Sequence, residues 1–152
     1  MDRFVDPAVP LYDLAAGDIA VVCQRCARRA VVAAVPVEDA RPISWPRRFA
    51  CGACGASASW EPRGGTTVWG APVDPFFRLP LWLSARCCGG RVLWAFNDAH
   101  LTLLEGYVAA KSRERGPRPG LTLVARLPGW LKQAKHRDEL LRVITRLRAK
   151  PG

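Results

Sequence analysis

The two stretches Cys23-Gln24-Arg25-Cys26 and Cys51-Gly52-Ala53-Cys54 decide the fold, and 24 residues separate them. A Cys-x-x-Cys turn directs two sulfurs at one point, and two such turns brought together form a tetrahedral thiolate cage that suits Zn²⁺. The segment between them contains strand-forming runs and turn residues. The pattern therefore predicts a zinc ribbon whose metal ligands are Cys23, Cys26, Cys51 and Cys54.

The expected role of this metal is structural. Protein ligands would fill all four positions and leave none for water or a substrate. The short strands of a ribbon also bury too little apolar surface to stay folded without the ion. A catalytic Zn²⁺ ion is therefore not expected.

The composition of the 152 residues is that of a globular protein. Hydrophobic residues make up 49% of the chain, which includes six tryptophans. No apolar run approaches the roughly 20 residues that cross a bilayer, and the segment from Met1 to Asp6 does not read as a signal peptide. We therefore expect a cytoplasmic protein that does not enter membranes, and cysteines that bind metal rather than form disulfides.

The net charge of +10 is distributed unevenly. Residues 1–76 contain eight basic and eight acidic residues, whereas residues 77–152 contain fifteen basic and five acidic residues. A basic half suggests a surface for nucleic acid or another polyanion, although a solvated basic face without a ligand is also common.

Alternating and apolar runs predict three β-hairpins, of which the first two carry the cysteine turns at their tips. The expected strands are Ile19–Val22 with Ala30–Val35, Arg47–Ala50 with Ala56–Trp60, and Leu81–Arg86 with Arg91–Phe96, and a further short strand is expected at Thr66–Trp69. Gly55 follows Cys54 and can adopt a left-handed conformation, whereas Ala27 follows Cys26. We therefore expect the second cysteine turn to be the better formed.

The C-terminal third predicts helices. An N-cap at Asn97 or Asp98 precedes the helical run Ala99–Arg115, a short helix is expected at Leu121–Leu127, and a final helix at Gly129–Ala149. The predicted fold is α+β: a zinc ribbon of short antiparallel β-hairpins followed by two or three C-terminal α-helices. Its predicted regions are a lead-in at 1–17 without important structure, a β region at 18–96 and a basic helical region at 97–152.

A resemblance to a known group of proteins rests on three segments. These are Asp74–Leu83, Cys87-Cys88-Gly89 with Leu93–Asn97, and Arg126–Lys132. Together they resemble small bacterial proteins that contain a zinc ribbon of the transcription-factor-B type. The resemblance implies a ribbon joined to a helical tail, and it implies no established role.

Cys87 and Cys88 are adjacent, and neighbouring residues of a strand point to opposite faces. Three interpretations remain open: one cysteine is a buried apolar residue, the pair contributes a ligand to the ribbon or to a second ion with His100, or the two form a reactive thiol pair. Cys87 and Cys88 are thus possible secondary metal or thiol residues.

The final helix carries a basic stripe opposite its apolar face, formed by Lys132, Lys135, Arg142 and Arg146, and helical spacing places Lys150 on the same face. Any surface helix can show such a face, but acidic residues that would balance it are scarce across residues 111–152. We interpret the stripe as a nucleic-acid-binding surface that contacts phosphates.

The function predicted from these features is a zinc-stabilised, cytoplasmic, non-catalytic protein that binds or associates with nucleic acid. The sequence contains no Ser-His-Asp pattern and no phosphate-binding glycine loop, so we expect neither an enzyme nor a small-molecule substrate. The alternative is a protein–protein adaptor or accessory subunit whose partner contacts a surface around Phe76, Phe77 and Trp82. DNA, RNA and protein all remain open as partners, as does the oligomeric state.

Overall fold

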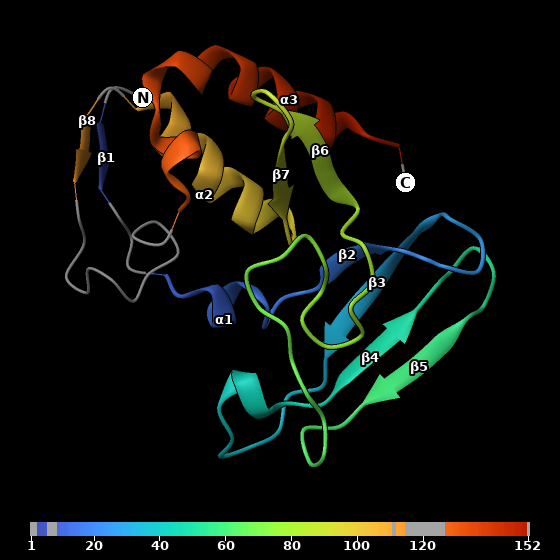
Figure 1. Cartoon of the computed structure of the whole chain (residues 1–152). Coiled ribbons are helices and arrows are strands. Elements are labelled where there is room, and N and C mark those ends of the chain that lie inside the picture. Colours follow the sequence, from blue (N-terminus) through green and yellow to red (C-terminus); the bar gives the residue numbers. More distant parts are fainter. Residues whose placement is uncertain (1–2, 6–8, 111, 115–126, 152) are drawn as a thin grey trace.

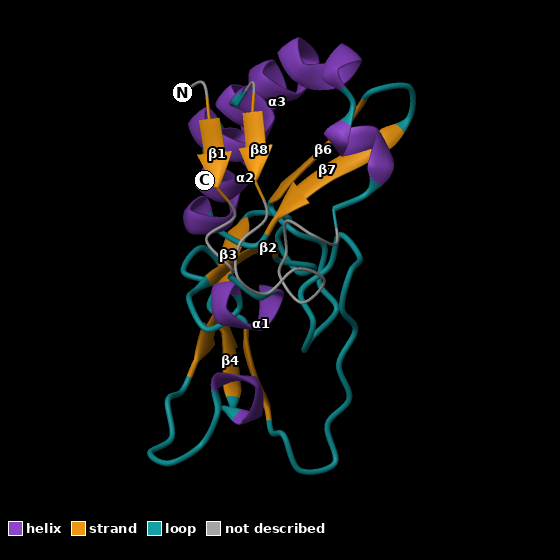
Figure 2. Cartoon of the chain, turned by 90° about the vertical axis from the view of Figure 1, so that its left-hand side faces the viewer, coloured by secondary structure: helices purple, strands orange, loops and turns teal. Residues whose placement is uncertain are grey.

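The computed structural model describes residues 3–5, 9–110, 112–114 and 127–151 (Figure 1). Its elements are, in order, β1 (Arg3–Val5), α1 (Leu11–Leu14), β2 (Ile19–Val22), β3 (Arg29–Ala34), the 3-10 turn η1 (Pro42–Ser44), β4 (Arg47–Ala50), β5 (Ser57–Trp60), β6 (Leu83–Cys87), β7 (Arg91–Ala95), α2 (Asp98–Ala109), β8 (Ser112–Glu114), the 3-10 turns η3 (Gly129–Lys132) and η4 (Ala134–His136), and α3 (Arg137–Ala149). Helices α2 and α3 lie at one end of the molecule and the largest sheet lies at the other (Figures 1 and 2). The predicted α+β class is confirmed.

The ribbon is a four-stranded antiparallel sheet in the order β2-β3-β4-β5. Val32 faces Ile19 on one side and Phe49 on the other, and all three side chains are buried. Because side chains alternate between the two faces of a strand, Arg29 and Arg48 point to the opposite, exposed face. The first two predicted hairpins have therefore joined into one sheet with a core face and a solvent face.

Backbone hydrogen bonds join the ribbon to the rest of the molecule along β2. The Ala20 N–H donates to the Phe96 carbonyl at 2.8 Å, and the Trp82 N–H donates to the Ala20 carbonyl at 3.0 Å. The Val22 N–H also donates to the Pro80 carbonyl, at 2.8 Å. The outer edge of β2 is thus occupied by other segments of the chain.

The third predicted hairpin is present as β6 and β7, which pair from Leu83 opposite Ala95 to Cys87 opposite Arg91. Its core side packs against α2 and α3, as Figure 2 shows. Leu93 of β7, Leu101 of α2 and Ile144 of α3 are each at most 1% exposed. The hydrophobic core therefore continues from the hairpin into the helices.

Asn97 caps α2 and also holds the N-terminal segment. Its side-chain oxygen accepts from the His100 N–H at 3.0 Å, as expected of an N-cap residue. Its amide nitrogen donates to the carbonyls of Leu14 and Asp18 at 2.9 and 3.0 Å. One side chain thus fixes the start of a helix and a loop that lies more than 75 residues earlier.

The predicted helix at Ala99–Arg115 is wrong at its C-terminal end. Helix α2 ends at Ala109, and Ser112–Glu114 forms β8, which pairs in parallel with β1. The expectation that residues 1–17 lack important structure is also wrong, because they include β1 and α1. A pairing between segments more than 100 residues apart depends on the tertiary fold and leaves no local signal.

The predicted final helix at Gly129–Ala149 is wrong in its first part. Two 3-10 turns precede α3, and Gln133 between them is extended, with φ −80° and ψ 130°. The acidic residues Asp138 and Glu139 lie in the first turn of α3, where they complement the helix dipole. These two residues are the sequence signal for the true start of the helix.

Two further local predictions have different outcomes. Thr66–Trp69 forms no strand. The predicted helix at Leu121–Leu127 lies outside the described residues except for Leu127, which is not helical.

Asp74 organises the loop between β5 and β6. Its carboxylate is fully buried and accepts from the backbone N–H groups of Phe76, Phe77 and Leu79, at 2.9, 2.7 and 2.7 Å. Desolvation raises the pKa of Asp74, while the same N–H donors oppose the shift. The turn that results buries Phe76 against the ring of Trp60.

The helices of the described residues are all too short or too polar to cross a membrane.

Candidate metal centre

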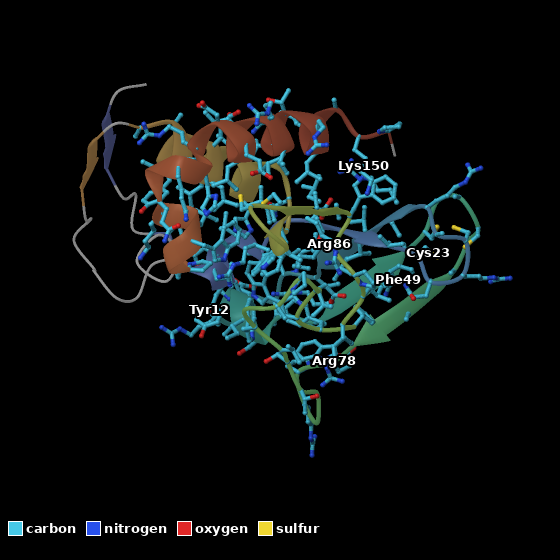
Figure 3. All side chains as sticks on the ribbon, turned by 45° about the horizontal axis from the view of Figure 1, so that its top comes forward. Tyr12, Cys23, Phe49, Arg78, Arg86 and Lys150 are labelled. Atoms are coloured by element: carbon cyan, nitrogen blue, oxygen red, sulfur yellow. The ribbon has the colours of Figure 1, made fainter. Side chains whose placement is uncertain are left out.

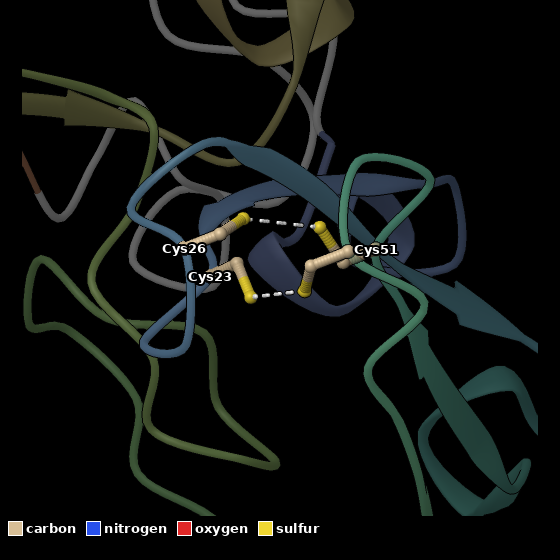
Figure 4. A group of neighbouring side chains, drawn as sticks. Cys23, Cys26 and Cys51 are labelled. Atoms are coloured by element: carbon tan, nitrogen blue, oxygen red, sulfur yellow. Dashed lines mark hydrogen bonds between the residues drawn. The ribbon is translucent and has the colours of Figure 1, made fainter.

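The four predicted ligand sulfurs converge at one end of the ribbon (Figure 4). The turn that holds Cys23 and Cys26 joins β2 to β3, and the turn that holds Cys51 and Cys54 joins β4 to β5. All four sulfur atoms lie within 4.8 Å of one another. In Figure 3, the end of the ribbon that carries Cys23 lies on the opposite side of the molecule from Tyr12 of α1.

The spacing of the sulfurs fits a metal ion. The Cys23 and Cys54 sulfurs are 3.7 Å apart, and the Cys26 and Cys51 sulfurs are 3.6 Å apart. In a regular tetrahedron with Zn–S bonds of about 2.3 Å, two sulfurs are about 3.8 Å apart. A disulfide would bring them to about 2.05 Å. The four cysteines therefore have the donor type and the spacing that a tetrahedral Zn²⁺ ion requires.

The two cysteine turns repeat the same backbone pattern. In the first, the Cys23 carbonyl accepts from Ala27 at 2.7 Å, and the Cys23 N–H donates to the Arg28 carbonyl at 2.9 Å. In the second, the Cys51 carbonyl accepts from Gly55 and the Cys51 N–H donates to Ala56, both at 2.9 Å. Each turn thereby presents its two sulfurs from the same side of a tight loop.

The residue after the second cysteine is left-handed in both turns. Gly55 has φ 77° and Ala27 has φ 62°. The expectation that the first turn is the less well formed is therefore wrong, since Ala27 adopts the conformation that was expected of glycine alone. Alanine can adopt this left-handed conformation at a modest energetic cost. The surrounding hydrogen bonds hold the backbone of Ala27 in this conformation.

The pKa values of Cys51 and Cys26 are shifted in opposite directions. Hydrogen bonding from the Cys54 backbone lowers the pKa of Cys51 to about 7, against the effect of desolvation. Hydrogen bonding at Arg28 lowers the pKa of Cys26, but desolvation and the neighbouring thiols outweigh it and raise that pKa to about 11. Four adjoining sulfurs repel one another as thiolates, so their common ionisation requires a cation such as Zn²⁺.

Basic side chains surround the ribbon end of the molecule. Arg25 and Arg28 are exposed on the first cysteine turn, and Arg29 and Arg48 are exposed on the outer face of the sheet. The net charge of residues 1–76 did not indicate this surface, because the basic and acidic charges there cancel in sum. The signal was available in the ribbon itself, where residues 19–60 contain six arginines and two acidic residues.

The predicted basic stripe is exposed but does not lie on one helix. Arg142 and Arg146 are four residues apart on α3, and both are exposed. Lys132 and Lys135 are exposed as well, on η3 and η4. The helical spacing argument therefore applies to the two arginines only.

Other cations of the C-terminal region have structural roles. Arg148 contacts Glu105 at 3.0 Å and Asp98 at 3.2 Å, which links α3 to α2. Arg137 donates to the Val108 carbonyl at 3.1 Å. Lys150 was placed on the basic face by helical spacing, but its ammonium lies 3.9 Å from the centre of the Trp82 ring and donates to the Trp82 carbonyl.

Cys87 and Cys88 have different surroundings. Cys87 is buried in β6, where desolvation raises its pKa to about 12, as expected of an apolar core residue. Cys88 lies in the following turn, beside His136 and Glu139. Among the described residues, His100 does not join Cys87 or Cys88 in a cluster of metal-ligand atoms. It is 1% exposed, its Nδ1 accepts from the Phe96 N–H at 3.0 Å, and desolvation lowers its pKa to about 4.

The aromatic surface that was expected for an adaptor is not exposed. Phe76 is 4% exposed and Trp82 is 9% exposed, and Phe77 is partly buried. Trp60 is also partly buried, and its indole nitrogen donates to the Thr66 carbonyl at 3.3 Å. The predicted contact surface around Phe76, Phe77 and Trp82 is therefore wrong.

A four-cysteine cluster at the tip of an antiparallel sheet is the arrangement of a metal-binding ribbon, and it is compatible with a zinc ribbon. Comparisons with protein-family models, with curated proteins and with solved structures found no match.

Proposed function

We propose that the protein is a zinc-stabilised, non-catalytic nucleic-acid-binding protein. In this proposal Zn²⁺ at the four-cysteine cluster makes the ribbon a rigid platform, and Lys132, Lys135, Arg142 and Arg146 contact phosphates. The proposal rests above all on these four cations, which are exposed in a region with few acidic residues.

The ribbon supplies a second cationic surface that supports the same function. Arg29 and Arg48 project from a face that also carries the small residues Ala50 and Ser59. Small side chains let a phosphate backbone approach closely, and arginine binds phosphate oxygens with two parallel hydrogen bonds. Arg25 and Arg28 extend this surface to the cysteine turn.

The decisive experiment measures binding of labelled single-stranded DNA, duplex DNA and single-stranded RNA by fluorescence anisotropy over a range of salt concentrations. Affinity should fall steeply with salt, since each neutralised phosphate releases bound counterions. The double variant Arg142→Glu/Arg146→Glu should weaken binding and reduce the slope of log affinity against log salt by roughly 2.

Matched double variants distinguish the loss of a specific binding surface from the effect of a changed net charge on affinity. Arg41→Glu/Arg63→Glu alters the net charge by the same amount at two exposed loop positions and should have a much smaller effect. Arg25→Glu/Arg28→Glu tests the ribbon surface. Equal losses for the α3 and the loop variants, or no measurable binding of any of the three nucleic acids, would remove the proposal.

A further inference from the structure

We propose that Cys88, His136 and Glu139 form a second metal site, which binds Zn²⁺ through three protein ligands and keeps a fourth position open. One donor atom from each residue lies within 4.8 Å of the other two. Thiolate, imidazole and carboxylate are the three donor types that Zn²⁺ accepts in proteins. This site is separate from the four-cysteine cluster and does not depend on the proposed function.

The tertiary fold brings the three donors together from two places in the chain. Cys88 lies in the turn between β6 and β7, while His136 immediately precedes α3 and Glu139 lies in its first turn. A spacing of three residues places His136 and Glu139 on the same side of the helix start. Because α3 packs against β6, this side faces the hairpin turn.

Cys88 is held in an uncommon backbone conformation. Its φ is 54°, and Gly89 and Gly90 follow with φ of 78° and 95°. The Glu139 Oε2 atom accepts from the Cys88 N–H at 2.8 Å, which ties the turn to the helix. The same carboxylate thus positions the cysteine and keeps its other oxygen, Oε1, for an ion.

The histidine is also positioned by a neighbour. The ring of Trp130 meets the ring of His136 edge to face, with centroids 6.4 Å apart. Edge-to-face packing of this kind favours one orientation of the imidazole ring. His136 and Glu139 are only partly buried, so an ion can reach them from solvent.

The fourth coordination position faces an open hollow of about 720 Å³. Besides the three ligands, Arg91, Gln133 and Lys135 line it. Zinc sites with three protein ligands keep an exchangeable fourth ligand, in contrast to closed four-cysteine sites. The two cations at the rim favour an anion in that position.

The test uses the full chain loaded with one equivalent of Zn²⁺, which fills the four-cysteine cluster, and then titrates it with Co²⁺. Because Co²⁺ binds more weakly than Zn²⁺ to the same ligands, it should not displace the bound ion. We expect one further equivalent of Co²⁺ to bind, with an absorption band for charge transfer from a thiolate. Added azide should shift the Co²⁺ spectrum by occupying the open position.

Variants identify the ligands. Cys88→Ser should abolish the charge-transfer band, and Glu139→Gln and His136→Gln should each weaken Co²⁺ binding by at least about tenfold, since even an outer partner of a ligand contributes that much. Asp138→Asn changes an exposed carboxylate of the same helical turn, and Cys87→Ala changes the neighbouring buried thiol; neither should alter Co²⁺ binding.

Circular dichroism and thermal unfolding of each variant, loaded with one Zn²⁺, establish that it is folded. The proposal is overturned if no second equivalent binds, or if Cys88→Ser and Glu139→Gln bind Co²⁺ as the parent does. An unchanged spectrum with azide overturns the open fourth position. Failure of the nucleic-acid experiments leaves these results unaffected, because the readout is the metal itself.

Discussion

Ala27 and Gly55 occupy equivalent positions, one residue after the second cysteine of each turn, and both have left-handed backbones. The N–H of each donates to the carbonyl of the first cysteine, at 2.7 Å for Ala27 and 2.9 Å for Gly55. The cluster thus has approximate internal symmetry in its backbone, although the two sequences differ.

This equivalence predicts opposite effects of two exchanges. Gly55→Ala should lower the free energy of unfolding by about 1 kcal/mol, because a residue with a Cβ atom rarely adopts a left-handed backbone conformation. A Cβ at Gly55 meets no atom within 4 Å, so the backbone alone causes the loss. Ala27→Gly should change stability by less than about 1 kcal/mol, and in the stabilising direction, because relief of strain exceeds the added entropy of the unfolded chain. Urea unfolding of the zinc-loaded proteins measures both; a larger loss for Ala27→Gly than for Gly55→Ala would contradict the equivalence.

Removal of the metal should unfold the ribbon. Structural Zn²⁺ contributes on the order of 10 kcal/mol to comparable small sites, far more than the short strands β2 to β5 can replace. Cys51→Ser should therefore lose one equivalent of Zn²⁺ and most of the β signal in circular dichroism, and excess chelator should bring the parent to the same spectrum. Cys87→Ala, a change of a buried thiol outside both clusters, should keep its Zn²⁺; an unchanged spectrum of Cys51→Ser would show that the ribbon does not need the ion.

The lowered pKa of His100 predicts that the protein loses stability in mild acid. Its ordinary pKa is about 6.5, whereas desolvation lowers the folded pKa to about 4. The unfolded chain therefore binds more protons between these values, so this contribution is complete above about pH 6.5 and is lost as the pH falls towards 4. From about pH 7 to about pH 5 the loss should be about 2 kcal/mol.

His100→Asn isolates this effect, because asparagine offers an acceptor near the position of Nδ1 and does not titrate. The free energy of unfolding, followed by urea denaturation at several pH values, should fall less steeply for this variant than for the parent. Metal release in acid is common to both proteins and cancels in the difference. Parallel curves would mean that His100 is not the titrating group.

The ion pairs of Arg148 link α3 to α2, and we expect their contribution to stability to depend on salt. Its guanidinium contacts Asp98, Glu105 and the Thr102 hydroxyl, at 3.2, 3.0 and 2.9 Å. Glu105 contributes most to raising the pKa of Arg148. Because the side chain is 35% exposed, Arg148→Ala should cost about 1 kcal/mol or less, and the cost should shrink at high salt. Arg146→Ala, an exposed neighbour on the same helix, should change the melting temperature very little.

Features that depend on short stretches of sequence were predictable. The paired cysteine turns, the apolar strands that flank them, the hairpin around Gly89-Gly90 and the cap at Asn97 follow from local residue types. The convergence of the four sulfurs follows from the spacing of the two turns, since antiparallel hairpins that lie side by side place their tips at one end of a sheet.

Features that depend on contacts between distant residues were not predictable. The parallel pairing of β1 with β8 joins the two parts of the chain that lie farthest apart among the described strands. Cys88 was marked as a possible ligand, but its neighbours His136 and Glu139 come from a helix start that the sequence pattern placed too early. Lys150 lies over Trp82 through tertiary packing, a contact that helical spacing alone does not indicate.

Strand β2 belongs to two structures at once, since it pairs with β3 on one edge and with residues around Trp82 and Phe96 on the other. The ribbon therefore cannot pivot relative to the helices without breaking main-chain hydrogen bonds. The cysteine cluster and α3 are consequently held at a fixed separation. A ligand large enough to contact both would have to match that separation.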